Sequence, residues 1–220
     1  MKIGVILSGC GNYDGSGIHE AVFCLLMLER LGVDYQCFAP DIYAEIYNPI
    51  TREKLSEKRN LLIESARIAR GNIYSLSQFQ MERFDGLVIP GNYTMNYNPP
   101  DGVAQVIRAV AEAGKPIAAT STAVIWVAEA LQAVEIQPKI TLGHLAAYPS
   151  EHPIINWALQ ASAKGIIIAQ TDADDFLEDD LNNIITTAGY LANQSIVQVF
   201  QAIEKTITKL VEMVTLVMSS

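Results

Sequence analysis

Short apolar runs bounded by glycine or proline alternate along this chain with amphipathic helical patterns. The runs KIGVILSG (2–9), GLVIP (86–90) and KPIAAT (115–120) are almost continuously apolar, which is typical of parallel strands buried on both faces. After the second run, apolar residues between 103 and 110 recur at the 3, 4 and 7 spacing of one helix face. Strands that alternate with helices predict an α/β fold with a doubly wound, mostly parallel sheet.

The length and charge of the chain narrow the classes of protein it can belong to. With 220 residues, half of them apolar, it can build one sizeable core, and we expect residues 1–220 to form a single domain. Lys and Arg number 15 against 24 Asp and Glu, a formal net charge of −9. No basic stripe is left to neutralise a phosphate backbone, so we expect no nucleic-acid partner.

Cysteine usage and the N-terminal residues predict a cytoplasmic protein. Cys10, Cys24 and Cys37 form no CxxC pair and are odd in number, which favours a reducing compartment and gives no support for zinc. The letters LSGC (7–10) match a lipoprotein cleavage box, but the apolar stretch before them is shorter than a signal peptide needs. No apolar run approaches the roughly 20 residues of a membrane-spanning helix, so we expect no membrane partner.

Three further segments give local predictions. The Asn48-Pro49 pair predicts a small hairpin or excursion off the sheet over residues 42–56. The acidic stretch 172–180 fails the calcium-loop pattern, because Phe176 and Leu177 occupy its fifth and sixth positions, so we expect a solvated turn and no metal. An apolar stripe from residue 196 to 214 predicts a long closing helix that packs on the sheet.

Ligands of doubly wound sheets bind outside the carboxyl ends of the strands. Three segments should meet there: residues 8–20, residues 91–101 and the turn at Ser121. The glycine-rich start of the first segment suggests a dinucleotide, but Asp14 stands at the third glycine position, where its charge would face the pyrophosphate. We therefore expect a small-molecule ligand and no cofactor.

Several segments resemble the enhancing-lycopene-biosynthesis proteins, a branch of the PfpI and class I glutamine amidotransferase-like superfamily. They are MKIGVILSGCGNYDGSGIHEAV, CFAPD, RNLLIESARIARG, GLVIPGN, GKPI and IITTAGYLANQSI, which together extend over nearly the whole chain. The resemblance implies a flavodoxin-like, three-layer sandwich and a possible homodimer. It also implies glyoxalase-like activity, in which methylglyoxal or glyoxal becomes a hydroxy acid without a cofactor.

The resemblance also assigns site residues. The family's cysteine at the strand-to-helix elbow maps onto Ser121, and its first-loop glutamate maps onto Glu20. The family's PGG oxyanion stretch maps onto Pro90, Gly91 and Asn92, the last of which can still enter a left-handed conformation. The residues expected to contact the ligand are Gly9, Cys10, Gly91, Asn92 and Thr122.

The serine at the elbow changes the chemistry to be expected. A helix N-terminus can convert a cysteine into a thiolate, but a serine hydroxyl needs a positioned base. Glu20 at an ordinary pKa of about 4.3 is a weak base, and His144 in KITLGH is the alternative. The predicted function is a small carbonyl or acyl pocket with weak or no glyoxalase-like activity. Two alternatives are a serine hydrolase using Ser121 and His144, and a non-catalytic binding or regulatory protein in which Ser121 merely fits a tight turn.

Overall fold

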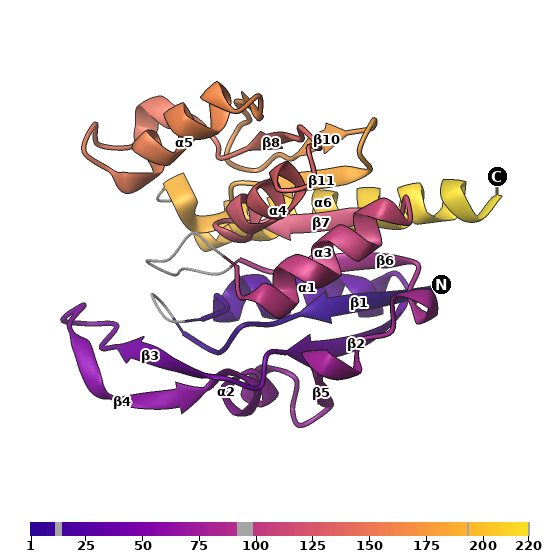
Figure 1. The fold of residues 1–220 in the computed structure, drawn as a ribbon, viewed down its shortest axis with the longest axis horizontal. Coiled ribbons are helices and arrows are strands. Elements are labelled where there is room, and N and C mark those ends of the chain that lie inside the picture. Colours follow the sequence, from indigo (N-terminus) through magenta and orange to yellow (C-terminus); the bar gives the residue numbers. More distant parts are fainter. Residues whose placement is uncertain (12–14, 92–98, 193, 220) are drawn as a thin grey trace.

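A seven-stranded sheet runs through the middle of the molecule in this computed structural model, which describes residues 1–11, 15–91, 99–192 and 194–219 (Figure 1). Its strands are β1 (Lys2–Ile6), β2 (Asp34–Ala39), β5 (Ile73–Ser75), β6 (Gly86–Ile89), β7 (Ile117–Thr120), β10 (Leu177–Asp179) and β11 (Ile184–Thr187). The strand order is β10-β11-β7-β6-β1-β2-β5, and β10 alone among the pairs of this sheet runs antiparallel to its neighbour. The expected doubly wound, mostly parallel sheet is confirmed.

Helices cover both faces of this sheet and complete the three layers (Figure 1). One face carries α3 (Asp101–Glu112) and α4 (Ala123–Gln132), and the other carries α1 (Ile18–Arg30), α2 (Leu61–Ile68) and α6 (Ile196–Ser219). Successive side chains along each strand point to opposite faces of the sheet. Ile6 and Leu87 pack with the first set of helices, and Val5 and Val88 pack with the second. Because both faces are covered, the strands read as continuous apolar runs.

The closing helix α6 packs on the sheet as its apolar stripe predicts. Ile203, Ile207 and Leu210 have no exposed surface. Burying a side chain of this size contributes about 1.5–3 kcal/mol to stability. Ile196, at the start of the stripe, is 46% exposed, so the buried part of the helix begins one turn later, at Val199.

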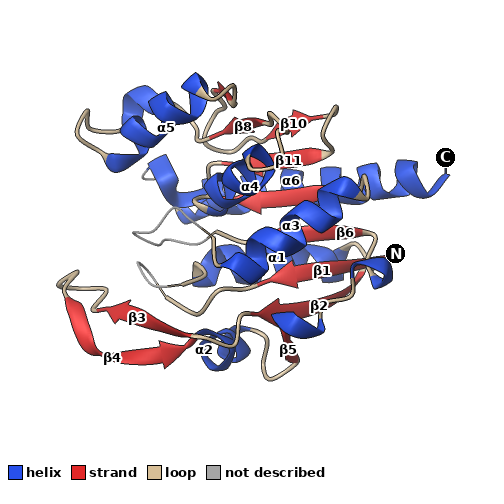
Figure 2. Cartoon of the chain, in the orientation of Figure 1, coloured by secondary structure: helices blue, strands red, loops and turns tan. Residues whose placement is uncertain are grey.

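Two smaller sheets lie beside the main one (Figure 2). The antiparallel pair β3 (Tyr43–Tyr47) and β4 (Lys54–Asn60) forms the hairpin expected from the Asn48-Pro49 pair and projects from the body of the protein. The parallel pair β8 (Lys139–Thr141) and β9 (Ile167–Ala169) lies with α5 (Pro153–Ala163) at the other end. Short 3-10 helices lie at Leu76–Gln78, Met81–Arg83, Leu145–Ala147 and Gly189–Ala192.

Helix α1 begins at Ile18, and no side chain caps it. Ser16 lies just before it and is buried, and its Oγ accepts a hydrogen bond from the Ser8 amide at 2.9 Å. The structure corrects the prediction made for the acidic stretch. The acidic stretch 172–180 is only partly a turn, because residues 177–179 form β10 on the edge of the sheet. Asp179 is buried there and accepts a hydrogen bond from the Lys139 amide at 2.7 Å, so its charge is satisfied by the backbone.

The described part of the chain contains neither a helix long and apolar enough to cross a membrane nor a group of three or more His, Cys, Asp and Glu side chains that could hold a metal ion.

Candidate active site

The chain direction reverses between β1 and β6 in the sheet. From β1 the chain continues to β2 and β5 on one side, then returns to β6 on the other side and continues to β7 and β11. The loops after β1 and β6 therefore leave the same edge of the sheet in opposite directions, at the position where doubly wound sheets bind their ligands. Gly17 in the first loop donates from its amide to the carbonyl of Gly91 in the second, at 2.7 Å.

Ser121 occupies a strained turn at this edge, between β7 and α4. Its φ is +49°, in the left-handed region that costs a residue with a Cβ about 1–2 kcal/mol. The Ser121 amide donates to the Thr187 carbonyl at the end of β11, at 3.0 Å, which anchors the turn to the sheet. Strain of this kind persists where the surrounding structure enforces it, and it is concentrated at functional sites.

The hydroxyl of Ser121 contacts two hydrogen-bond acceptors and one donor. Its Oγ donates to Glu20 Oε1 at 2.6 Å and lies 3.2 Å from the carbonyl oxygen of Ala188, a second acceptor for the same proton. The Tyr190 amide donates to Ser121 Oγ at 3.0 Å. Because the contact to Glu20 is the shorter of the two, the carboxyl is the preferred acceptor of the Ser121 proton.

Glu20, in the first turn of α1, accepts a second hydrogen bond through the same oxygen. Thr120 Oγ1 donates to Glu20 Oε1 at 3.0 Å and accepts from the Gly91 amide at 2.6 Å. The three segments expected to meet, after β1, after β6 and at Ser121, are thus joined by hydrogen bonds. The Gly91 amide donates to Thr120, so in the free protein this N–H is not available to a ligand.

Glycines enclose the carboxyl group of Glu20 on three sides. A Cβ on Gly17, Gly91 or Gly189 would lie in forbidden contact with the Glu20 carboxyl. A Cβ on Gly189 would also overlap Ser121 Oγ. These positions therefore need glycine, because only a bare backbone leaves room for the acid.

Burial changes the acid strength of Glu20. The residue is 3% exposed, and desolvation raises its pKa to about 7, although the hydrogen bonds from Ser121 and Thr120 favour the charged form. A carboxylate with this pKa is a far better proton acceptor at neutral pH than one at 4.3. The sequence-based view of Glu20 as a weak base is therefore corrected.

His144 lies in a different polar cluster. Its Nδ1 is 2.9 Å from Gln170 Oε1 and its Nε2 is 3.3 Å from Asp172 Oδ1, and the ring is exposed. No hydrogen bond within the described ranges joins it to Ser121. The structure thus brings Ser121 together with Glu20 and does not pair it with His144.

The remaining expected ligand-binding residues are placed as follows. Gly9 has a φ of +107° and donates from its amide to Ser65 Oγ on α2 at 2.8 Å, so it holds the first loop. Cys10 is partly buried, and Thr122 is buried directly after Ser121. Asn92 lies outside the described residues.

Sequence reasoning missed the loop after β11, which supplies Ala188, Gly189 and Tyr190 to the site. The signal was present in IITTAGYLANQSI, which carried part of the family resemblance without a role for any of its residues. The loop is recognisable as a site element only once β11 is seen to pair with β7, since that pairing brings Thr187 level with Thr120.

No family model matches the chain, but it is similar to individual known proteins. A human protein, glutamine amidotransferase-like class 1 domain-containing protein 3, mitochondrial, is 30% identical over 226 residues, with 96% of this chain and 83% of that protein covered. An Ehrlichia chaffeensis isoprenoid biosynthesis protein with an amidotransferase-like domain superposes with a TM-score of 0.84 at 31% identity, covering 96% of this chain and 98% of the other. Glyoxalase III of Candida albicans shares the fold, with a TM-score of 0.63, 12% identity and 96% of each chain covered. The resemblance found in the sequence is confirmed, and the chain belongs to the family of glutamine amidotransferase-like class 1 domain proteins.

Proposed function

We propose that this protein binds a small carbonyl compound between Glu20 and Ser121 and converts 2-oxoaldehydes such as methylglyoxal slowly to hydroxy acids, without a cofactor. The observation that carries this proposal is the 2.6 Å hydrogen bond from Ser121 Oγ to the buried Glu20 carboxyl. A hydroxyl that donates to a base of suitable pKa is the arrangement that nucleophilic catalysis by serine requires.

In the first step, Ser121 Oγ attacks the aldehyde carbon of methylglyoxal. A C–O bond forms, the π electrons of the carbonyl move onto its oxygen, and the Oγ proton passes to Glu20. The amides of Thr122 and Ala123, at the start of α4, have no acceptor in the part of the chain that the structure describes and are available to the new oxyanion. Glu20 then returns the proton to this oxygen, which leaves a neutral hemiacetal and a free carboxylate.

In the following steps Glu20 moves a second proton. The carboxylate takes the C–H proton of the hemiacetal carbon, which gives an enediolate. The hemiacetal hydroxyl proton then passes to the oxygen on the neighbouring carbon, and Glu20 delivers the proton it took to that carbon. The product is a 2-hydroxy ester of Ser121, and water cleaves it to release lactate and restore the hydroxyl. The net reaction adds one water to methylglyoxal, with no change in overall oxidation state.

Slow turnover is expected because the nucleophile at position 121 is a serine hydroxyl and not a cysteine thiol. We propose that Ser121 stands where relatives carry their elbow cysteine. A thiol at a helix N-terminus ionises within the physiological range, whereas the serine hydroxyl reacts only as Glu20 removes its proton. Ser121→Cys is therefore expected to raise the rate of methylglyoxal turnover.

The test measures methylglyoxal consumption and lactate formation by wild type, Ser121→Ala, Ser121→Cys and Glu20→Gln. We expect the alanine and glutamine variants to lose about 100-fold or more of the wild-type rate, because each lacks one partner of the proton transfer. Thermal unfolding of each variant checks that it is folded. Wild-type turnover that survives Ser121→Ala unchanged would overturn the proposal.

A further inference from the structure

Two buried polar atoms at the start of α4 have no hydrogen-bond partner among the residues described. They are Thr122 Oγ1 and Trp126 Nε1, on side chains of residues that are 5% and 3% exposed. A buried polar group left without a partner costs about 1–3 kcal/mol. Most such groups in native proteins are paired, so two of them on one helical turn require an explanation.

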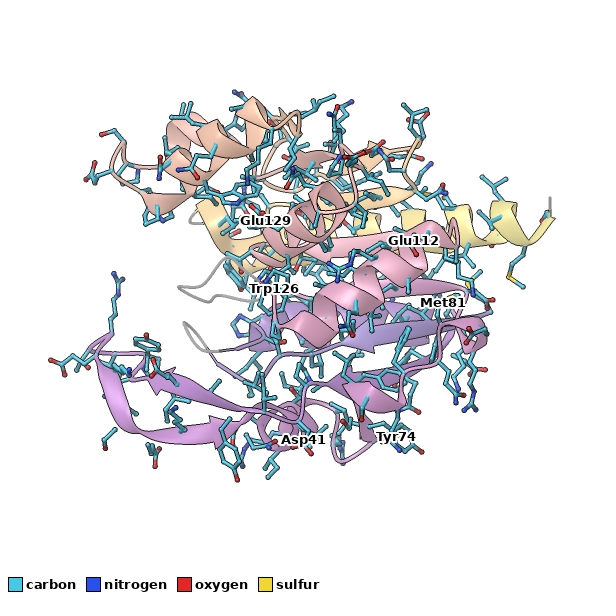
Figure 3. All side chains as sticks on the ribbon, viewed as in Figure 1. Asp41, Tyr74, Met81, Glu112, Trp126 and Glu129 are labelled. Carbon is cyan, nitrogen blue, oxygen red and sulfur yellow. The ribbon has the colours of Figure 1, made fainter. Side chains whose placement is uncertain are left out.

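The two atoms lie on the same face of the helix. Thr122 and Trp126 are four residues apart, a spacing that places their Cβ atoms about 5–6 Å from each other. Side chains on a helix lean toward its N-terminus, so the Trp126 ring covers the turn that contains Thr122. That turn begins directly after Ser121, and Figure 3 shows Trp126 close to the end of the sheet where β7 finishes.

The groups gathered there are hydrogen-bond donors. The indole N–H of Trp126 can only donate, and the Thr122 hydroxyl can donate as well. The amides of Thr122 and Ala123 lie at the same helix end, where the dipole of α4 favours negative charge. The chemistry of this set fits an oxygen acceptor, and a carboxylate fits it best.

The other tryptophan of this chain shows which kind of group can pair with an indole N–H. Trp157, on α5, donates from its Nε1 to the carboxylate of Glu129 on α4, at 2.7 Å. A carboxylate therefore satisfies one buried indole of this protein, while the other, that of Trp126, has no such partner among the residues that the structure describes.

We propose that Thr122 and Trp126 form a subsite for the carboxylate of a small 2-hydroxy or 2-oxo acid, with one carboxylate oxygen on each side chain. The subsite deepens the proposed function and rests on it, because cleavage of the Ser121 ester leaves a carboxylate beside the first turn of α4. It adds short oxo and hydroxy acids to the compounds that the site binds, and it makes the hydroxy acid product an inhibitor.

The test titrates lactate into wild type, Trp126→Phe and Trp157→Phe by calorimetry and measures the Tm of each. Trp126→Phe keeps the ring and removes the N–H, so the Kd for lactate should rise about tenfold. Its Tm should equal or exceed that of wild type, because an unpaired buried donor has been removed. Trp157→Phe should show the reverse, with an unchanged Kd and a lower Tm, since it leaves Glu129 without its donor. Thr122→Val, which removes the hydroxyl at nearly constant volume, should weaken lactate binding in the same way as Trp126→Phe.

Several outcomes would overturn the subsite. They are no lactate binding by wild type, a Kd that Trp126→Phe leaves unchanged, or a fall in Tm for Trp126→Phe as large as for Trp157→Phe. The last result would mean that a structural water already holds the indole. The proposed reaction is separable, because Ser121→Ala should lower turnover by about 100-fold or more while lactate still binds to Thr122 and Trp126. Lactate binding that depends on Trp126, in a wild type that does not consume methylglyoxal, would refute the reaction and keep the subsite.

Discussion

Glu20 and His144 each anchor a polar cluster, and each has a raised pKa for an opposite reason. Burial raises the pKa of Glu20 to about 7, because a carboxylate is poorly solvated inside the protein. The hydrogen bonds of His144 to Asp172 and Gln170 raise the pKa of the imidazole, because they favour its charged form. Burial thus favours the neutral form of the acid, and hydrogen bonding favours the charged form of the histidine. The group placed to accept the Ser121 proton is the glutamate, because the Ser121 hydroxyl donates to its carboxyl group, whereas His144 contacts Gln170 and Asp172.

The largest effect expected in the Glu20 cluster comes from Gly189→Ala. The methyl group would overlap both Glu20 and Ser121 Oγ at a φ of +52°, so we expect a loss of about 2–5 kcal/mol in the free energy of unfolding. The matched control is Gly32→Ala, at a φ of +69° with nothing within 4 Å of the added carbon, which should cost only about 1–2 kcal/mol. Equal losses in denaturant titrations of the two variants would show that the carboxyl is not tightly enclosed.

Glu20→Gln tests whether burial of the acid has the consequence for stability that its pKa implies. The pKa of Glu20 is about 7 in the folded state against 4.5 as the reference value for the unfolded chain. Between these values the native state holds a proton that the unfolded state has released, so stability falls as pH rises, by about 3 kcal/mol in total. The unfolding free energy of wild type should therefore fall by that amount relative to that of Glu20→Gln between pH 4.5 and 7.5. A difference that stays constant with pH would mean that Glu20 keeps an ordinary pKa.

Thr120→Val should have a smaller effect. The substitution removes the hydroxyl that accepts from the Gly91 amide and donates to Glu20, and it leaves a buried N–H unpaired. We expect a loss of about 1–3 kcal/mol in the free energy of unfolding, measured with denaturant. Thr120→Ser keeps the hydroxyl and should retain most of the stability; if it is as unstable as the valine variant, the bridge from Gly91 to Glu20 contributes little.

His144→Ala should have the smallest effect of all. Its contacts are exposed, so methylglyoxal turnover at pH 7 should stay within about twofold of wild type. Because the folded pKa is raised, any stabilisation by His144 is present below about pH 6.5 and is lost as the pH rises through the folded value. A rate that falls as far as in Glu20→Gln would restore His144 as the base.

Much of the fold could be predicted from the chain because local patterns carry it. The apolar runs at β1, β6 and β7 and the stripe on α6 depend on periods of neighbouring residues, and all four elements form where the patterns place them. The strand β10 was missed because two of its three residues are acidic, and its pairing with β11 and the hydrogen bond from the Lys139 amide to Asp179 are visible only in the structure.

The candidate site, like the fold, could be predicted only in part from the sequence. The chain alone indicated Glu20, Ser121 and the meeting of three loops, because the alternation of strands with helices and the family resemblance are both properties of the sequence. It could not show that Glu20 is desolvated, that Gly189 lies against its carboxyl group, or that Trp126 Nε1 is buried without a hydrogen-bond partner in the described part of the chain. Those facts depend on contacts between segments as far apart as residues 20 and 189, and both burial and hydrogen bonding are set by such contacts. The sequence determined which residues are present at the edge of the sheet, and the tertiary structure decided which of them can hold or release a proton there, because it alone excludes water from the acid.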